Sequence, residues 1–551
     1  MLVYGDHVRE RDTRTLIGEL AATLTGEHDA IVTTFIAASE LAQGIADAEY
    51  AVRDEDARSL ATDTAMALLV ALARAIDASW AGLPPALDAA RAQLAALAAL
   101  PLPPTVRTKR AEGHAYYAVY PEAYLAAARR SSTPPDHVIG IRSIGCGLAA
   151  LVAAATGAPL PATVRPHGDP FRRSVRVAPG LVAEWLDDPR ATFAIADEGP
   201  GISGSSFGAI ADLLEDHGVA ADRLVYFPSH PGLLGEAASP RHRDRWARAR
   251  RHVVTADELL RDRLASWIEA VVGTLVEPLV ELSAGAWRRL RYARETEWPP
   301  SFVQQERLKV LAHTRTGRWL ARFVGLGAAG GHALDLARAT SAAGFTPQVA
   351  GLRHGFLIER WIDGAAALEP DAFGRERLLA HLARYLALRA TRRGEPGASC
   401  TELIAMVRRN VTLGAGAHVA DRVVGELAPI AMEPVEIDGK LQAWEWLVQS
   451  DGTLIKTDAY DHHAAHDLIG CQDIAWDVAG AAIELGLGQA EERWLAGQVG
   501  VDLQRLAFVR PCYLAFQLGR ARLAADASDA AEASRLRDAA DRYARLVTSR
   551  C

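Results

Sequence analysis

Apolar residues recur with helical spacing over most of the first hundred residues. Alanine- and leucine-rich stretches such as 61–80 and 87–100 put apolar side chains on one face of a helix. The sequence Pro101-Leu-Pro-Pro104 ends this pattern, because proline cannot continue a helix. The pattern predicts a helical cap over residues 1–110.

After residue 110 short apolar runs alternate with helical stretches. This alternation predicts an α/β domain over 111–236, with a parallel sheet and helices on both of its faces. In such a sheet, ligands bind beyond the carboxyl ends of the strands. The runs expected to form strands are 137–141, 162–165, 193–196 and 224–227.

A loop of small residues follows the apolar run at 193–196. Asp197 and Glu198 come first, then 199–206 (GPGISGSS), then an amphipathic helix closed by Gly218. Glycine lets a backbone approach an anion closely, and the N–H groups that open a helix point toward a bound phosphate. The serine hydroxyls add donors, and the carboxylates can hold ribose hydroxyls or a metal ion. An ordinary turn with an N-capping serine is the alternative.

This loop resembles the 5-phosphoribosyl-1-pyrophosphate (PRPP) loop of type I phosphoribosyltransferases, although its spacer is one residue longer. The turn after 137–141 corresponds to the loop that contacts pyrophosphate in that family. The resemblance implies Mg²⁺-assisted chemistry at C1 of a phosphorylated ribose, with Asp197 and Glu198 as catalytic residues. The phosphate-binding residues that it implies are Arg142, Ser143, Arg165, Gly199, Gly201, Ser203, Gly204, Ser205 and Ser206. For Arg165, which belongs to a cluster with Arg172 and Arg173, a solvated face is the alternative.

The stretch 237–300 begins with a charged segment at 240–251 and predicts a helical connector, whose basic run is typical of a solvated helix face. A β-hairpin is then expected over 308–324, with its turn at 315–317. The glycine pattern at 325–330 fits a dinucleotide fingerprint. Because a hairpin precedes it instead of a parallel strand, no dinucleotide site is predicted there.

Three segments of the last region resemble aminoglycoside-phosphotransferase-like kinases: 355–364, 454–458 and 470–479. Asp438 lies 20 residues before Asp458, close to the spacing of that family's catalytic and metal-binding aspartates. The resemblance implies an α+β kinase-like domain over 301–551 that uses ATP and Mg²⁺. By this resemblance Asp438 is catalytic, Asp458 binds the metal, Asp477 braces the catalytic loop, Glu359 marks the hinge strand, and Arg322 takes the place of the nucleotide lysine.

The sequence departs from the kinase pattern at several positions. The family's asparagine is Ala443 here, so Glu445 is expected to take over its metal contact. Arg322 is not an equivalent point charge to lysine, and Asp438-Gly439 is also typical of a plain turn. A transition-metal site is the second hypothesis for the cluster that follows Asp458, with a polar surface loop as the favoured interpretation. That cluster contains Asp461, His462, His463, His466 and Asp467.

The amino-acid composition limits the classes of protein to which this chain can belong. Half of the 551 residues are hydrophobic and 23% are charged, as in soluble globular proteins of several domains. A net charge of −8 argues against a general nucleic-acid binder. The five cysteines are scattered and odd in number, which favours reduced thiols over a disulfide framework. Without an apolar run of membrane-spanning length or a signal-peptide core, a cytoplasmic protein is expected, and the alanine, arginine and glycine content is typical of a GC-rich bacterial genome.

The sequence therefore predicts a cytoplasmic bifunctional enzyme of nucleotide metabolism. One half transfers or cleaves a phosphoribosyl group, with PRPP as substrate, and the other phosphorylates a small molecule with ATP and Mg²⁺. Its partners are expected to be small molecules, not nucleic acid or membrane, and a homodimer is left open. Two alternatives stand: a non-catalytic PRPP- or nucleotide-binding regulator, and a kinase with an inactive phosphoribosyltransferase-like platform.

Overall fold

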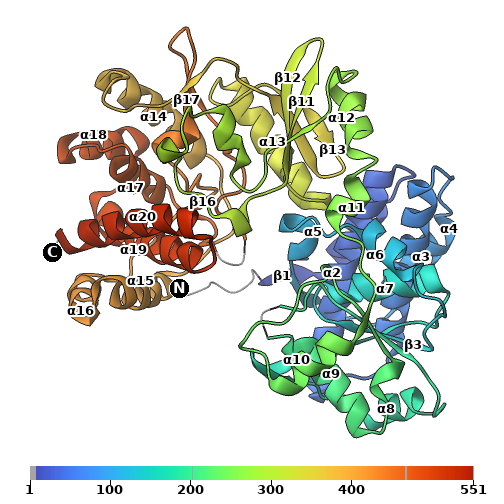
Figure 1. Cartoon of the computed structure of the whole chain (residues 1–551). Coiled ribbons are helices and arrows are strands. Elements are labelled where there is room, and N and C mark those ends of the chain that lie inside the picture. The colour runs from blue at the N-terminus through green and yellow to red at the C-terminus, as the bar shows by residue number, and fades with distance from the viewer. Residues whose placement is uncertain (1–7, 202, 466–467, 550–551) are drawn as a thin grey trace. The chain divides into compact units, whose positions relative to one another are not determined.

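The computed structural model describes residues 8–201, 203–465 and 468–549, and Figure 1 shows their helices and strands. The described chain divides into two compact units. The N-terminal unit comprises 8–264 with 325–329, and the C-terminal unit comprises 265–324 with 330–549. Their boundary falls inside the stretch 237–300 for which the sequence predicts a connector. Among the described residues, no helix is both long and apolar enough to span a bilayer.

Four helices form the first part of the N-terminal unit: α1 (Thr13–Thr23), α2 (His28–Arg53), α3 (Leu60–Trp80) and α4 (Asp88–Ala99). Ser59 caps α3 through a reciprocal side-chain and backbone pairing with Thr62. Two strands that the sequence pattern does not predict bracket these helices. β1 (Val8–Asp12) and β2 (Thr105–Lys109) pair antiparallel, and both are rich in charged residues without an apolar alternation.

A parallel sheet of five strands follows in the order β4-β3-β7-β8-β9, which confirms the α/β prediction. Along β3, Ile139 and Ile141 face a core that includes residues of two helices, α8 (Pro179–Trp185) and α9 (Ser205–Asp216). The alternate residue Gly140 lies against α7 (Gly145–Thr156), where a Cβ would come within 2.2 Å of the Gly145 carbonyl. The strands are β3 (His137–Ile141), β4 (Ala162–Val164), β7 (Phe193–Ala196), β8 (Leu224–Phe227) and β9 (Arg250–Arg251).

The strand order places two loops at one point of the sheet. β3 lies between β4 and β7, so the chain leaves β3 toward one edge and later returns to its other side. At such a switch point the loops after the two central strands open a crevice between them. These are the loops that begin at Arg142 and Asp197. A two-stranded hairpin, β5 (His167–Asp169) and β6 (Arg172–Ser174), lies between β4 and β7 in the sequence.

The remaining elements of the N-terminal unit are short helices. α5 (Glu112–Tyr116) and α6 (Pro121–Ala128) precede β3, whereas α10 (Pro240–Arg248) and α11 (Ala256–Leu260) lie on either side of β9. Trp246 of α10 joins the core formed by β3, β7 and α9. The charged stretch that the sequence assigns to a connector therefore contributes to this unit.

The C-terminal unit begins with an antiparallel sheet in the order β10-β11-β12-β14-β13. Figure 1 labels three of its strands, β11, β12 and β13. The predicted hairpin is confirmed, since β11 and β12 pair antiparallel around a turn at 315–316. The strand before the glycine pattern at 325–330 is β12, which pairs antiparallel with β14 as well as with β11, so this pattern does not follow a parallel strand. The strands are β10 (Val280–Glu281), β11 (Lys309–Thr314), β12 (Gly317–Phe323), β13 (Val349–Arg353) and β14 (Phe356–Arg360).

Helices dominate the rest of the C-terminal unit, which makes it an α+β fold as predicted. Its core includes Tyr385, Trp446, Trp476 and Tyr513. Small sheets pair β15 (Ala366–Ala367), β17 (Trp446–Val448) and β18 (Leu454–Lys456), and separately β16 (Pro434–Val435) and β19 (Gln472–Asp473). The helices that lie wholly or mostly in the unit are α12 (Leu264–Val272), α13 (Gly327–Ala342), α14 (Arg375–Ala390), α15 (Cys400–Ala415), α16 (Ala417–Gly425), α17 (Ala475–Glu484), α18 (Gln489–Val499), α19 (Leu503–Asp526) and α20 (Ala530–Ser549).

Candidate functional site

A cleft of about 840 Å³ opens in the C-terminal unit. One part of its lining is apolar and comes from the antiparallel sheet and the segments after it: Leu320, Pro347, Trp361, Ile362, Ala367 and Leu447. The charged part of the lining contains Arg291, Glu306, Lys309, Arg322, Glu359, Arg360, Lys440, Glu445 and Asp458. Four residues that the sequence assigns to the nucleotide and the metal, Arg322, Glu359, Glu445 and Asp458, therefore line one cavity.

Two cations lie side by side on the sheet at this cleft. Lys309 of β11 is paired in register with Arg322 of β12. Arg322 is only 2% exposed, and its guanidinium forms an ion pair with Asp458 and lies 3.6 Å from the carboxylate of Asp461. Lys309 Nζ lies 3.9 Å from the second oxygen of Asp458. Arg322 thus occupies the strand position predicted for a phosphate-binding cation, and a carboxylate of the same site neutralises it.

Asp458 follows β18 at a bend in the chain where its φ is 50°. His462 lies four residues on, with Nε2 3.3 Å from Asp458 Oδ2. Asp458, Asp461 and His462 each offer one ligand atom, and these atoms lie within 4.8 Å of one another. Burial lowers the pKa of His462 to about 4, so its ring is neutral near pH 7. The three side chains form a group with the size and the donors of a cation site.

Asp438 is buried behind this group, with 1% of the residue exposed. Tyr385 donates its hydroxyl to Oδ2, Lys456 Nζ lies 3.5 Å from the same oxygen, and His462 Nδ1 lies 3.6 Å from Oδ1. Burial on its own would raise the pKa of Asp438, but Lys456 and His462 hold it well below its usual range. The sequence implies contact between Asp438 and a substrate hydroxyl, whereas in the structure its carboxylate is enclosed by protein groups.

Asp477 supports the loop that carries Asp438. Its carboxylate accepts hydrogen bonds from the backbone N–H of Asp438 at 2.7 Å and of Gly439 at 2.9 Å. Burial and the neighbouring Asp438 raise the pKa of Asp477 to about 6. This is the bracing contact that the resemblance implied for Asp477.

Two further acidic residues that the sequence assigns to the site, Glu359 and Glu445, each lie beside a cation. Glu359 is buried within β14, where burial raises its pKa and Arg322 opposes the rise. Glu445 pairs with Lys440, whose Nζ lies 2.7 Å from Oε1. Burial works against ionisation of Glu445, but Lys440 and Lys456 bring its pKa below the usual value.

Lys440 is a site residue that sequence reasoning missed. It lines the cleft, and its N–H donates to Asp438 Oδ1 at 3.1 Å. Its position two residues after Asp438, on the same loop, was the available signal.

The histidine cluster that follows Asp458 is divided in the structure. His462 lies against Asp458. Burial lowers the pKa of His463 to about 3, and the charge of Arg389 lowers it as well. His466 and Asp467 lie outside the described residues.

In the N-terminal unit, the loop after β7 contacts the turn of the β5–β6 hairpin. Ser203 and Ser205 both donate to the Pro170 carbonyl, at 3.0 Å and 2.6 Å. Gly201 and Gly204 have φ values of 64° and 58°, which glycine adopts without strain. Gly199 lies against the same turn, since a Cβ there would be 3.0 Å from the Gly201 N atom. Ser205 and Ser206 open α9.

The acidic pair of this loop is partly buried. Burial raises the pKa of Asp197 to about 7, although the Glu198 N–H donates to its carboxylate at 2.8 Å. The Glu198 carbonyl accepts from the N–H of Ser229 at 3.0 Å, which ties the loop to the end of β8. A protonated Asp197 can donate to, as well as accept from, a ligand hydroxyl near neutral pH.

The two arginines predicted to bind phosphate are held by carboxylates of the helical region. Arg142 donates Nε to Asp47 at 2.9 Å and forms an ion pair with Asp56. Arg165 donates Nε to Asp47 at 2.9 Å and Nη1 to the Arg142 carbonyl at 3.0 Å. Ser143 comes directly after Arg142, and its carbonyl accepts from the N–H of Cys146, in the first turn of α7, at 3.3 Å. Both guanidinium groups are therefore occupied by protein groups.

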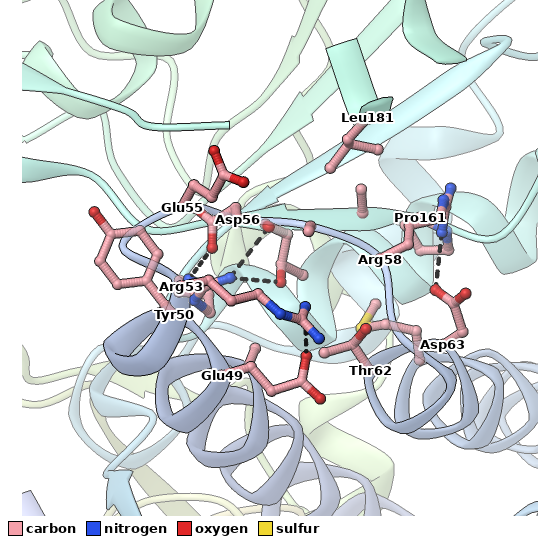
Figure 2. A pocket seen from close by; sticks show the side chains of 16 residues that line it. Glu49, Tyr50, Arg53, Glu55, Asp56, Arg58, Thr62, Asp63, Pro161 and Leu181 are labelled. Carbon is pink, nitrogen blue, oxygen red and sulfur yellow. Dashed lines mark hydrogen bonds and ion pairs between the residues drawn. The ribbon is translucent and has the colours of Figure 1, made fainter. Parts of the chain in front are cut away.

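Arg142 also lines a pocket of about 400 Å³ between the helices and β4. Figure 2 shows charged pairs along this pocket, with Arg53 next to Glu49 and Arg58 next to Asp63, and these pairs lie 3.1 Å and 3.0 Å apart. The partners of Arg142 lie about 90 residues away in sequence, at separations of 95 for Asp47 and 86 for Asp56. No local pattern signals such pairs.

Comparison with known proteins gives structural matches alone. No protein-family model matches the chain, and no curated protein does. Choline kinase LicA from Streptococcus pneumoniae matches at 13% identity, over 52% of this chain and 99% of that one, with a TM-score of 0.33. A choline/ethanolamine kinase family protein from Mesorhizobium loti matches at 16% identity, over 53% and 99%, with a TM-score of 0.31. The GDP complex of aminoglycoside 2'-phosphotransferase-IIIa matches at 13% identity, over 51% and 98%, with a TM-score of 0.33.

Proposed function

We propose that the C-terminal unit transfers a phosphoryl group from a nucleoside triphosphate to a small molecule. One observation carries this proposal: Lys309, Arg322, Lys440 and Asp458, from four separate stretches of chain, line one cleft that also has an apolar wall. Phosphoryl transfer needs positive charge around the phosphate oxygens and a fixed geometry, and little covalent chemistry from the protein. The lining of this cleft matches that requirement.

The parts of the cleft suit different parts of the nucleotide. The apolar wall, with Leu320 and Leu447, suits the flat face of a nucleobase, since ligand pockets are mostly apolar with a few polar groups that fix orientation. Lys309, Arg322 and Lys440 suit the phosphates. When Arg322 binds phosphate it releases Asp458, whose carboxylate then becomes available to a metal ion.

The residues present fit a divalent cation on the nucleotide phosphates. Asp458 and Asp461 provide two carboxylates whose ligand atoms lie within 4.8 Å of each other. Carboxylate oxygens are the ligands that Mg²⁺ prefers, and the ion would neutralise charge on the transferred phosphate. Asp438 is a positioning residue in this arrangement, since it contacts the Lys440 backbone and the His462 ring and is closed off from the cleft.

The test is phosphate transfer by the full chain. The protein is incubated with ATP, Mg²⁺ and a panel of small alcohols, amino alcohols and nucleosides, and products are detected by mass spectrometry. Asp458→Asn is expected to lower the rate at least ~100-fold, as for other groups that stabilise transition-state charge. Asp451→Asn is the matched control, because Asp451 lies in an exposed turn and accepts from the Thr453 N–H. Equal rates for the two variants would remove the proposal.

A second function is favoured by the N-terminal unit, in which the loops after β3 and β7 lie next to each other at the switch point of the sheet. We propose that this crevice binds a sugar phosphate of the PRPP class, with Gly199, Gly201, Gly204 and Ser206 at the phosphate. The hydroxyls of Ser203 and Ser205, which donate to the Pro170 carbonyl in the structure, would turn to the phosphate when it binds. Asp197 and Glu198 would hold the ribose hydroxyls. Isothermal titration with PRPP, ribose 5-phosphate and ribose tests it, and only the phosphorylated sugars should bind. Release of pyrophosphate with any nucleobase would distinguish a transferase from a regulator.

A further inference from the structure

The His462 ring lies between two carboxylates. Its Nε2 atom is 3.3 Å from Asp458 Oδ2, and its Nδ1 atom is 3.6 Å from Asp438 Oδ1. A histidine that binds a metal commonly directs its other ring nitrogen at a carboxylate, which fixes the tautomer and the ring orientation. Asp438 is in the position of that supporting carboxylate, and Tyr385 and Lys456 hold it there from behind.

The ligand group that results is a mixed one. Asp458 and Asp461 offer oxygen atoms and His462 offers a nitrogen, all within 4.8 Å of one another. Mg²⁺ is a hard ion that takes oxygen ligands and keeps much of its water, whereas imidazole suits first-row transition metals. A nitrogen at this place therefore shifts the preference of the site away from Mg²⁺.

The charges around the group show when a cation can enter. Arg322 pairs with Asp458 and lies 3.6 Å from Asp461, while Arg307 lies 3.1 Å from Asp461. A divalent cation between the two carboxylates would be repelled by Arg322 in its present position. Nucleotide phosphates would draw Arg322 away, so the metal and the nucleotide are expected to bind together.

We propose that Asp458, Asp461 and His462 Nε2 form a binding site for a first-row transition-metal dication such as Mn²⁺, in preference to Mg²⁺. This rests on the proposed phosphotransferase function of the same cleft and specifies its metal. Asp438 acts through His462 as its positioning residue.

The experiment measures Mn²⁺ and Mg²⁺ binding to the full chain in the presence of a non-hydrolysable ATP analogue. Calorimetry is expected to give roughly tenfold or more tighter binding for Mn²⁺, in line with the sensitivity of metal affinity to the ligand shell. Electron spin echo spectroscopy of the bound Mn²⁺ should detect a directly bonded imidazole nitrogen. His462→Gln should remove both the nitrogen signal and the preference for Mn²⁺.

His332→Gln is the matched control, because His332 is half exposed and pairs with Glu436 outside the ligand group. Circular dichroism verifies that both variants fold. If a variant does not fold, the nitrogen signal of the unmodified protein still tests the proposal. Equal affinities for the two ions, a Mn²⁺ signal without nitrogen, or a signal that persists in His462→Gln would each overturn the metal assignment. Binding of the ATP analogue, measured with each ion, separates the two proposals. If the analogue binds with neither Mn²⁺ nor Mg²⁺, the phosphotransferase proposal fails as well.

Discussion

Arg322 stands where the resembled kinase sequences have lysine, and its contacts give a physical reason for arginine at this position. Its guanidinium forms an ion pair with Asp458 and also approaches Asp461, and it is almost fully buried. A planar guanidinium with five donors can serve two carboxylates, whereas an ammonium group is a compact point charge. Arg322 therefore has a structural role in the absence of ligand in addition to the phosphate contact proposed for it.

Replacing Arg322 by methionine should destabilise the C-terminal unit. Asp458 and Asp461 would lose a buried partner, and removing one side of a buried pair costs about 3–5 kcal/mol. Urea unfolding of the variant measures this loss. Arg318→Met is the control, because Arg318 and its partner Asp363 are both more than a third exposed, and such a pair contributes only about 0–1 kcal/mol. A loss of similar size in both variants would contradict the role given to Arg322.

Asp197 should make the stability of the N-terminal unit depend on pH. Its pKa is raised by burial from 3.8 to about 7, so its ionised form is disfavoured in the folded state. Stability is therefore lost as the pH rises from the unfolded pKa through the folded pKa. Asp197→Asn should unfold at higher urea concentration than the unmodified protein at about pH 8, and the difference should vanish near about pH 4.

Asp212 provides the control of opposite sign for that measurement. Burial would raise its pKa, but His242 and Arg245 lower it to about 2. Its contribution is present above the unfolded pKa and is lost as the pH falls toward the folded pKa. Asp212→Asn should therefore lower stability at neutral pH and have little effect in strong acid. If Asp197→Asn also lowers stability at neutral pH and has little effect in strong acid, the pKa of Asp197 is not raised in the folded protein.

At the scale of elements, the turn into α9 depends on glycine at two positions with different surroundings. Gly201 and Gly204 both have left-handed backbone angles, but a Cβ at Gly201 would meet open space, whereas one at Gly204 would come within 2.5 Å of the Leu234 side chain. The same substitution can thus separate backbone strain from crowding.

Gly201→Ala should cost about 1–2 kcal/mol of unfolding free energy, from the left-handed conformation alone. Gly204→Ala should lose that amount and about 1–3 kcal/mol more, because Leu234 must also move. Equilibrium unfolding of the two variants measures the difference. Equal losses would mean that Leu234 adjusts without cost and that crowding does not constrain this turn.

At the scale of the whole molecule, the chain comprises two compact units, each with its own sheet. We expect two calorimetric unfolding transitions. A non-hydrolysable ATP analogue with a divalent cation should raise only one of them, because the proposed nucleotide cleft belongs to the C-terminal unit. At about 100 times the dissociation constant the stabilisation is about 2.7 kcal/mol. A single transition, or an equal shift of both, would contradict this expectation.

Much of the fold follows from local patterns in the sequence. The spacing of neighbouring apolar residues predicts the parallel sheet, the hairpin before 325–330 and the helices of the first region. β1 and β2 were missed because their residues are polar and charged, and they are strands only through pairing across nearly a hundred residues. The stretch 237–300, predicted as a helical connector, also contains β9 and β10. Each of these strands has two residues and completes a larger sheet, so no local pattern marks it.

The sequence by itself determined the chemistry available to each site: the glycine and serine loop after β7, the spacing of Asp438 and Asp458, and the bracing residue Asp477. Only the tertiary structure decided which partners those groups take. It pairs Arg142 with Asp47 and Asp56, encloses Asp438 behind His462, and brings Lys440 to the cleft. The physical reason is the distance along the chain between the groups that interact. Hydrophobic periodicity depends on residues that are neighbours in the sequence, whereas an ion pair or a ligand group depends on which loops the topology places within a few ångströms of each other.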